Sequence, residues 1–426
     1  MPVYQSPGVY VEEVPSSIKP IAGASTSTPG FIGIVPDTIT LAASRKPTPN
    51  NPATTKYVSY DVTTPADKPV LITNWTQFTK AFGDLVGDAD APEVGGGSPP
   101  SSPPDGDIDM GHRYLAHAVY GFFNNGGSRC YVARMTSVGG IGGVLRAFAA
   151  IDEIALVAAP GIVDDAVRSA IVSHCVNTGD RFAIFDGPET AADLTTLTKI
   201  GASGGVMPAR TDYAAWYFPW IRVFDPSTKM LAPTSDGRIS VPPSGHLAGI
   251  YARVDTNRGV HKAPANEVVQ GALDVTQAIS KAEQDGLNLR GVNCIRILNS
   301  NILAWGARTI GGDDNMDLKY INVRRTLLFL RESIDEGTQW VVFEPNTPAL
   351  WQTITRNVTA FLTNVWRSGA LFGNTPAEAF YVKCDAETNP PELRELGQVV
   401  TEIGVAIVRP AEFVIFRISQ WSAPSK

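Results

Sequence analysis

The chain has 426 residues, of which 43% are hydrophobic and 18% are charged, and this balance is typical of a soluble globular protein of two or three domains. The formal net charge is −7 and no run of more than two Lys or Arg residues occurs, which argues against DNA or RNA as a partner. The four cysteines are scattered without the spacing of a zinc site or a disulfide framework, so we expect reduced thiols, no metal and no cofactor.

The sequence shows no targeting or membrane segment. Its first five residues lack the basic start, apolar core and small-residue cleavage site of a signal peptide. The longest apolar stretch, residues 154–163, is interrupted by Pro160 and Gly161 and is too short to span a bilayer. We therefore expect assembly in the cytoplasm, no direct membrane insertion, and exposure outside the cell only after lysis or release.

The N-terminal quarter is predicted to be an arm followed by an exposed, proline-rich region. Residues 1–27 form the arm, with strand chemistry at Val9, Tyr10, Val11, Glu12 and Val14. Residues 28–111 form the region after it. Within this region, 28–35 predicts a short buried strand, the six prolines of 36–69 predict loop and edge strand on an exposed surface, and 86–111 predicts a mobile loop.

The middle of the chain, residues 112–290, is predicted to be an α/β domain. An amphipathic helix is expected over 112–123 and a strand over 129–134. Two short apolar runs, 154–159 and 181–185, are separated by a helical pattern over 162–176. This spacing is typical of a βαβ unit, so we expect a central, mostly parallel sheet with helices on both faces.

The C-terminal part is predicted to be an α+β domain, residues 291–408, followed by a second arm, residues 409–426. Helices are expected over 319–336 and over 348–368, the latter with Thr347 as its N-cap and Pro348 at its first position. Two strands follow, joined by the corner 409–412. The first contains Val399, Val400, Ile403, Val405 and Ile407, and the second contains Phe413, Val414, Ile415, Phe416 and Ile418.

Both arms thus carry apolar strands with no obvious partner in the chain. An unpaired strand edge presents N–H and C=O groups that another chain can pair with. Chain ends are ordinarily polar and frayed, which makes two apolar ends unusual. Strand chemistry alone leaves two hypotheses open: each end folds back into its own sheet, or the chain polymerises by exchanging its ends.

Signs of catalysis are weak. Residues 201–205 match G-x-S-x-G around Ser203, but no apolar strand precedes this segment and no helical pattern follows it. The alternating carboxylates Asp105, Asp107 and Asp109 lack the Gly and Glu of a calcium loop, and Asp186 has the sequence context of a turn residue. We predict that the protein is not an enzyme; an oligomeric α/β hydrolase acting through Ser203 is the alternative.

Many blocks, spread over nearly the whole chain, resemble the contractile tail sheath family, which covers phage tail sheaths, R-type bacteriocins and extracellular contractile injection systems. The first five similar blocks are 4–14, 28–33, 122–132, 217–220 and 241–252. The other seven are 262–266, 291–296, 305–309, 320–325, 340–346, 369–371 and 410–416. So many blocks in the same order are more specific than any single motif.

The resemblance implies a subtilisin-like middle domain and a structural role. Terminal strands of each subunit would complete a small sheet on neighbouring subunits, with 399–408 as the acceptor strand and with 16–28 and 409–412 as flexible links. The implied partners are further copies of the chain in stacked rings, an inner tube protein, baseplate and terminal cap proteins, and a paralogous sheath protein. We expect an injection system sheath that contracts to drive the tube through a target envelope; a phage tail or bacteriocin sheath is the alternative.

Four arginines are candidates for contact with the tube. Arg356 and Arg367 are the only charged residues of the helix 348–368, so its polar face is wholly cationic and would suit acidic groups on a tube. The alternative is the helix 319–336, with Arg324 and Arg325. A solvated surface without a partner remains an equal explanation, because most exposed charges have no partner.

Overall fold

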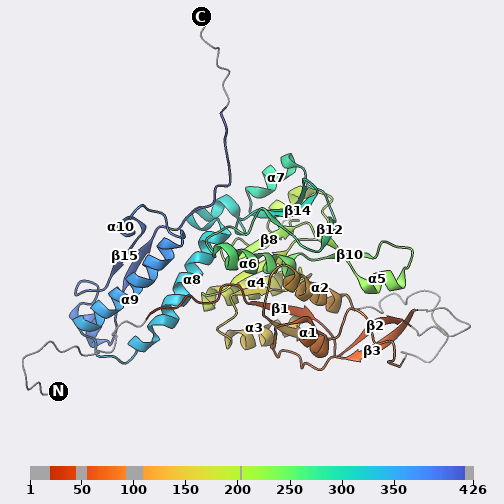
Figure 1. Ribbon diagram of the computed structural model, residues 1–426, viewed down its shortest axis with the longest axis horizontal. Coiled ribbons are helices and arrows are strands. Elements are labelled where there is room, and N and C mark those ends of the chain that lie inside the picture. Colours follow the sequence, from red (N-terminus) through yellow and green to blue (C-terminus); the bar gives the residue numbers. More distant parts are fainter. Residues whose placement is uncertain (1–19, 45–54, 93–108, 202–203, 418–426) are drawn as a thin grey trace, which may run out of the picture. The chain divides into compact units, whose positions relative to one another are not determined.

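The computed structural model describes residues 20–44, 55–92, 109–201 and 204–417 (Figure 1). These residues form two compact units. The larger unit contains residues 25–329 and 407–417, and the smaller contains 20–24 and 330–406. Among the described helices, none combines the length and the apolar character that a membrane crossing requires.

A nine-stranded sheet is the centre of the larger unit. Its order is β11 (Glu267–Val268), β14 (Asn301–Trp305), β13 (Val292–Leu298), β8 (Ala214–Phe218), β7 (Phe182–Asp186), β6 (Leu156–Ala158), β1 (Pro29–Ile34), β5 (Cys130–Met135) and β4 (Val70–Ile72). The strands from β13 to β5 are parallel to one another, and β4, β14 and β11 are antiparallel to their neighbours. The expected mostly parallel sheet is confirmed.

Helices cover both faces of this sheet. Successive side chains of a strand point to opposite faces, and in the buried strands the side chains on both faces are apolar, so each face needs a cover. Phe182 and Ile184 belong to a core shared with α1 (Trp75–Phe82), α2 (Met110–Asn124) and α6 (Ser244–Arg258). Ala183 and Phe185 belong to a second core shared with α3 (Ile141–Ala149), α4 (Asp165–Thr178) and α7 (Lys281–Asn288). The predicted βαβ unit is the β6, α4, β7 segment, whose strands pair in parallel.

The remaining elements of the larger unit lie outside this sheet. They are a three-stranded sheet of β10 (Arg238–Val241), β9 (Ile221–Phe224) and β12 (Ala272–Val275), a hairpin of β2 (Thr38–Ser44) and β3 (Thr55–Asp61), and helix α5 (Pro226–Leu231). Short 3-10 helices are η1 (Val138–Gly140), η2 (Leu194–Thr198) and η4 (Gly312–Leu318).

Two expected domain limits differ from the structure. The buried strand predicted over 28–35 is confirmed as β1, but β1 lies between β6 and β5 in the middle of the large sheet, so the region 28–111 is not a separate, surface-exposed part of the chain. Residues 291–305 do not start a C-terminal domain, because β13 pairs with β8 and carries β14 into the same sheet. In both cases strand pairing between segments distant in sequence sets the limit.

The smaller unit contains the end of one long helix, all of a second, and a two-stranded sheet. Helix α8 (Ile321–Thr338) begins in the larger unit and ends in the smaller one, where η5 (Gln339–Val341) follows. Helix α9 (Pro348–Arg367) begins at the predicted cap, since the Thr347 side chain accepts a hydrogen bond from the Leu350 N–H. The other elements are α10 (Pro376–Ala379), α11 (Pro391–Glu395), and the two-stranded sheet of β15 (Phe380–Lys383) and β16 (Glu402–Val405).

The apolar stripe predicted on α9 is buried. Trp351, Ile354, Val358, Phe361, Leu362 and Val365 all lie on its inner face, and α9 packs against β15. The opposite face of the helix carries Arg356 and Arg367, which are both exposed. The sequence therefore predicted both the limits of this helix and which of its faces is buried.

Candidate inter-subunit strands and their anchorage

The C-terminal apolar segment forms no strand within the described chain. Phe413, Val414, Ile415 and Phe416 are between 68% and 84% exposed and belong to no helix or strand. In Figure 1 this dark blue segment leaves the larger unit without a strand arrow. The predicted strand is thus absent among the described residues of this segment. Ile418 and the N-terminal residues Val9, Tyr10, Val11, Glu12 and Val14 lie outside the described residues.

The predicted acceptor segment contains a short strand with one open edge. Strand β16 pairs only with β15 among the described strands. In this register the Ala406 N–H donates to the Ala379 carbonyl oxygen, at 2.8 Å. Main-chain groups of an antiparallel strand alternate between its two edges, so those of Ile403 and Val405 point away from β15. Two of the predicted acceptor residues therefore face an edge that is open among the described residues.

Asn389 prolongs this strand beyond its β15 partner. Its buried side-chain amide accepts a hydrogen bond from the Val400 N–H at 2.6 Å and donates one to the Val400 carbonyl oxygen at 3.0 Å. The amide thus takes the place of a partner strand on the β15 side. Val399 and Ile407 lie outside β16. Both have odd residue numbers, like Ile403 and Val405, so their main-chain groups face the open edge if the alternation continues.

We expect Asn389→Ala to release the segment before β16 and to shorten the open edge. The substitution leaves the Val400 N–H and C=O without these partners, and each lost hydrogen bond costs about 0.5–1.5 kcal/mol. Hydrogen exchange measured on peptides covering 396–402 should become faster, while peptides of the large sheet should be unchanged. Asn374→Ala, outside both strands, is the matched control. Unchanged exchange at 396–402 would contradict this role for Asn389.

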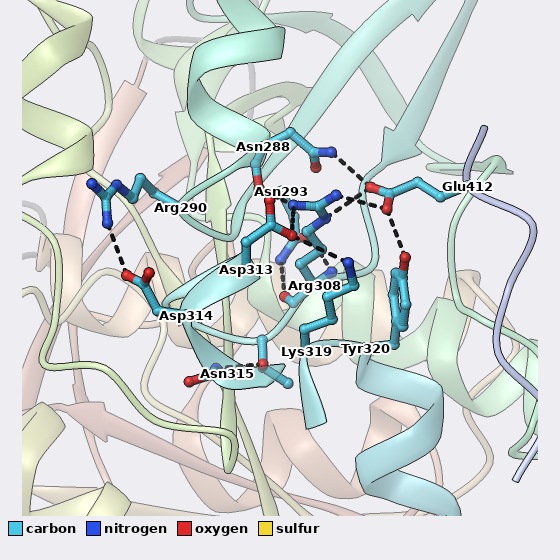
Figure 2. Close-up of polar contacts among 11 residues, drawn as sticks. Asn288, Arg290, Asn293, Arg308, Asp313, Asp314, Asn315, Lys319, Tyr320 and Glu412 are labelled. Carbon is cyan, nitrogen blue, oxygen red and sulfur yellow. Dashed lines mark hydrogen bonds and ion pairs between the residues drawn. The ribbon is translucent and has the colours of Figure 1, made fainter. Parts of the chain in front are cut away.

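A cluster of polar side chains holds the residue that precedes the exposed C-terminal segment. Figure 2 shows the Glu412 carboxylate facing Arg308, with Asn288 and Tyr320 on either side. Arg308 donates from Nε and Nη2, both at 2.8 Å, Asn288 donates from Nδ2 at 2.7 Å, and the Tyr320 hydroxyl donates at 2.9 Å. We call these four residues the Glu412 node.

Arg308 is itself fixed from behind. Its Nη1 donates to the Asn288 carbonyl oxygen at 3.1 Å and to Asp313 Oδ1 at 3.0 Å. Asn293 accepts from the Arg308 N–H and donates to the Arg308 carbonyl oxygen, each at 2.8 Å. The Arg308 side chain is only 2% exposed and that of Glu412 is 20% exposed, so water screens this bidentate pair less than a surface ion pair.

The electrostatics of the node favour the charged carboxylate. Burial works to raise the pKa of Glu412, but the hydrogen bonds from Arg308 and Asn288 outweigh it and hold the pKa below its ordinary value. Burial works to lower the pKa of Arg308, and the hydrogen bond to Glu412 reverses that effect. The ion pair therefore persists at neutral pH.

The flexible links expected on either side of the body are fastened where they are described. The 409–412 corner is held by the Glu412 node and by Arg409, which donates to Asp317 at 2.9 Å. On the N-terminal side, the Thr26 hydroxyl donates to Asp255 Oδ2 at 2.6 Å. The 409–412 corner, expected to be a flexible link, is therefore fastened to the body in this structure, and the anchor is a buried arginine that no local sequence pattern marks.

Arg324 and Arg325 have partners inside the larger unit and do not form an exposed cationic face. Arg325 is 3% exposed, pairs with Asp255 at 2.6 Å and lies over the Tyr251 ring. Arg324 pairs with Asp212 at 3.3 Å, and its guanidinium lies 3.7 Å from the centre of the Tyr213 ring. Their assignment to a tube-facing surface is corrected, since tertiary contacts have already used their charges.

We expect Arg325→Met to be strongly destabilising. Removing one partner of a buried ion pair leaves the other charge without compensation, which costs about 3–5 kcal/mol. Here the Asp255 carboxylate would lose its buried partner, and the Thr26 carbonyl oxygen would lose a donor. Urea unfolding of the subunit should show the loss. Arg222→Met is the control: its exposed side chain pairs with Asp274 at 3.9 Å, so about 1 kcal/mol or less should be lost. Equal losses would contradict the prediction.

Asp186, the candidate catalytic residue that the structure describes, is hydrogen-bonded to the start of a helix. It is the buried last residue of β7, and its carboxylate accepts from the N–H of Ser244, the first residue of α6, at 2.8 Å and from the Ser244 hydroxyl at 2.7 Å. Burial raises the pKa of Asp186 to about 6. Sequence reasoning missed these partners, which lie 58 residues away. Ser203, Asp105 and Asp107 lie outside the described residues, while Asp109 caps α2. Among the described side chains, no cluster of three or more His, Cys, Asp or Glu suits a metal ion.

Two family models match consecutive parts of the chain and together cover most of it. The phage tail sheath protein central domain matches residues 139–310, and the phage tail sheath C-terminal domain matches residues 313–420. This chain belongs to the phage tail sheath family. The open strand edge and the exposed C-terminal segment are therefore features of a sheath protein.

Solved structures of sheath assemblies match this sheath protein over nearly its whole length. One is the PVC sheath complex of an extracellular contractile injection system in its contracted state, with 26% identity, a TM-score of 0.70, and coverage of 99% of both chains. Another is the contracted helical sheath of the anti-feeding prophage, with 26% identity, a TM-score of 0.67, and coverage of 98% of this chain and 100% of that one.

A curated relative from a phage matches less of the sheath protein. The tail sheath protein of Burkholderia phage BcepMu is 24% identical over 239 residues, which are 54% of this chain and 47% of the phage protein. The chain thus spans about half the length of this relative. The family, the mixed α/β fold and the likeness to helical sheath assemblies follow from these matches.

Proposed function

We propose that this protein is the structural subunit of a contractile injection system sheath, whose copies polymerise around an inner tube and are joined by exchanged terminal strands. Full-length likeness to contracted injection system sheaths supports this more than the partial likeness to a phage tail protein does. The single observation that carries the strand exchange is the exposed apolar segment 413–416 in a chain that also has an open edge on β16.

In this proposal, segments 413–418 and 9–14 of neighbouring copies add to β15 and β16 of one subunit. Main-chain hydrogen bonds supply the affinity, and alternate apolar side chains supply the specificity. In this proposal the exchanged sheet persists while the bodies reorient. Contraction would draw its energy from subunit contacts formed in the short state, so no nucleotide or cofactor is needed. We propose no catalytic role.

The proposed partners are the inner tube protein, baseplate and terminal cap proteins, and a paralogous sheath protein. A structure of the anti-feeding prophage baseplate, which contains a chain 27% identical to this one, supports the baseplate as a partner. For the tube, we retain Arg356 and Arg367 as the contact residues, since both are exposed on one face of α9. A phage tail sheath is the second candidate, supported by the phage relative.

Electron microscopy of particles purified with the inner tube tests the proposal. We expect sheaths of two lengths: a long, narrow form around the tube and a short, wide form from which the tube protrudes. Treatment with acid or urea should convert the long form to the short form and never the reverse. Filaments with one fixed length per subunit and one diameter would contradict contraction and leave only a static polymer.

A further inference from the structure

The transition from folded body to C-terminal arm occurs at one residue. Glu412 receives hydrogen bonds from Asn288, Arg308 and Tyr320, whereas residues 413–417 make no hydrogen bond to any other described residue. No linker residue separates the anchored part of the chain from the exposed segment 413–416, because Phe413, its first residue, follows Glu412 directly.

We propose that Glu412 is a register pin, a positioning residue that decides which side chains of the arm face the acceptor sheet of the neighbouring copy. The inference rests on the proposed exchange of strands. In a strand, successive side chains point to opposite faces, so a shift of one residue exchanges the two sets. Here the sets are Phe413 with Ile415, and Val414 with Phe416.

The node has the stiffness that such a role requires. The Glu412 carboxylate accepts two parallel hydrogen bonds, from Nε and Nη2 of one guanidinium, which fix its plane as well as its position. That guanidinium belongs to Arg308, which is buried and braced by Asn293 and Asp313. A simple tether would need none of these contacts, since an unstructured link joins two bodies without fixing an orientation.

Insertions between Glu412 and Phe413 separate a pin from a tether. One inserted alanine should exchange the two side-chain sets and reduce the yield of extended sheaths by about tenfold or more. Two inserted alanines should restore the facing and recover most of the yield, although the link is longer. In the Glu412→Gln background, the one-residue and two-residue insertions should give similar yields. Equal yields for both insertions in the otherwise unchanged chain would overturn the proposal.

A second measurement uses the unassembled subunit and does not depend on polymerisation. Chymotrypsin cleaves after Phe413 and Phe416, and the pin should protect the first site because the protease must accommodate residues on both sides of the bond. Glu412→Gln should raise the ratio of cleavage after Phe413 to cleavage after Phe416 by about tenfold. Asp285→Asn, an exposed carboxylate on α7, is the matched control and should leave the ratio unchanged. An unchanged ratio in Glu412→Gln counts against the pin.

Truncation after Glu412 distinguishes failure of the pin from failure of the proposed function. If the truncated subunit still forms normal extended sheaths, the exchange of C-terminal strands is wrong and the pin falls with it. If truncation abolishes sheaths while both insertions assemble equally well, strand exchange stands and only the pin is wrong. Circular dichroism of each purified variant shows that the subunit remains folded.

Discussion

Replacing Ile403 by proline should abolish sheath assembly and leave the subunit folded. The Ile403 N–H points to the open edge of β16, so proline removes a donor that an incoming strand needs but no donor to β15. Each lost main-chain hydrogen bond costs about 1 kcal/mol, and the proline ring also blocks close approach. Every subunit of the polymer repeats this loss. Electron microscopy and sedimentation should show only unassembled subunits.

Ile403→Ala is the matched control, because it removes the same apolar side chain and keeps the N–H group. It should form sheaths in good yield if the main chain carries the pairing. The Val405 N–H points to the same edge, so Val405→Pro should behave like Ile403→Pro. If the two proline variants assemble as well as the unchanged chain, β16 is not the acceptor edge, whatever the alanine variant does.

The double charge reversal Arg356→Glu with Arg367→Glu should release the tube from extended particles. The exposed face of α9 would change from two positive to two negative charges in every subunit. A single exposed pair is worth only about 0.2–1 kcal/mol, yet a sheath repeats it along the whole tube, so the summed effect is large. Counting tubes inside extended sheaths by electron microscopy measures it.

Arg394→Glu provides the control for the charge reversal. Arg394 is exposed on α11 and lies outside the α9 face, so its reversal should leave the tube sheathed. Attraction between exposed charges is screened by salt, and tube binding of the unchanged sheath should weaken as the ionic strength rises. If the double variant retains its tubes at the level of the control, α9 does not contact the tube through these arginines.

Elements whose signals are local could be predicted from the amino-acid sequence. Thr347 and Pro348 fix the start of α9, and its apolar stripe fixes the buried face, because cap and periodicity act within a few turns. The β6, α4, β7 unit was readable for the same reason. The apolar residues 413–416 were also recognisable, since strand propensity depends on side-chain type alone.

Which charged groups already have a partner within the chain became clear from the folded structure. Arg325 reads as a surface charge in its helix, but it is buried against Asp255, 70 residues away. Glu412 reads as part of a loose corner, but it is held by Arg308 at a separation of 104 residues. Contacts between such distant positions leave no trace in local composition or periodicity. Availability for a partner is therefore a property of the folded chain, whereas the tendency of a segment to form a helix or a strand is written in its own residues.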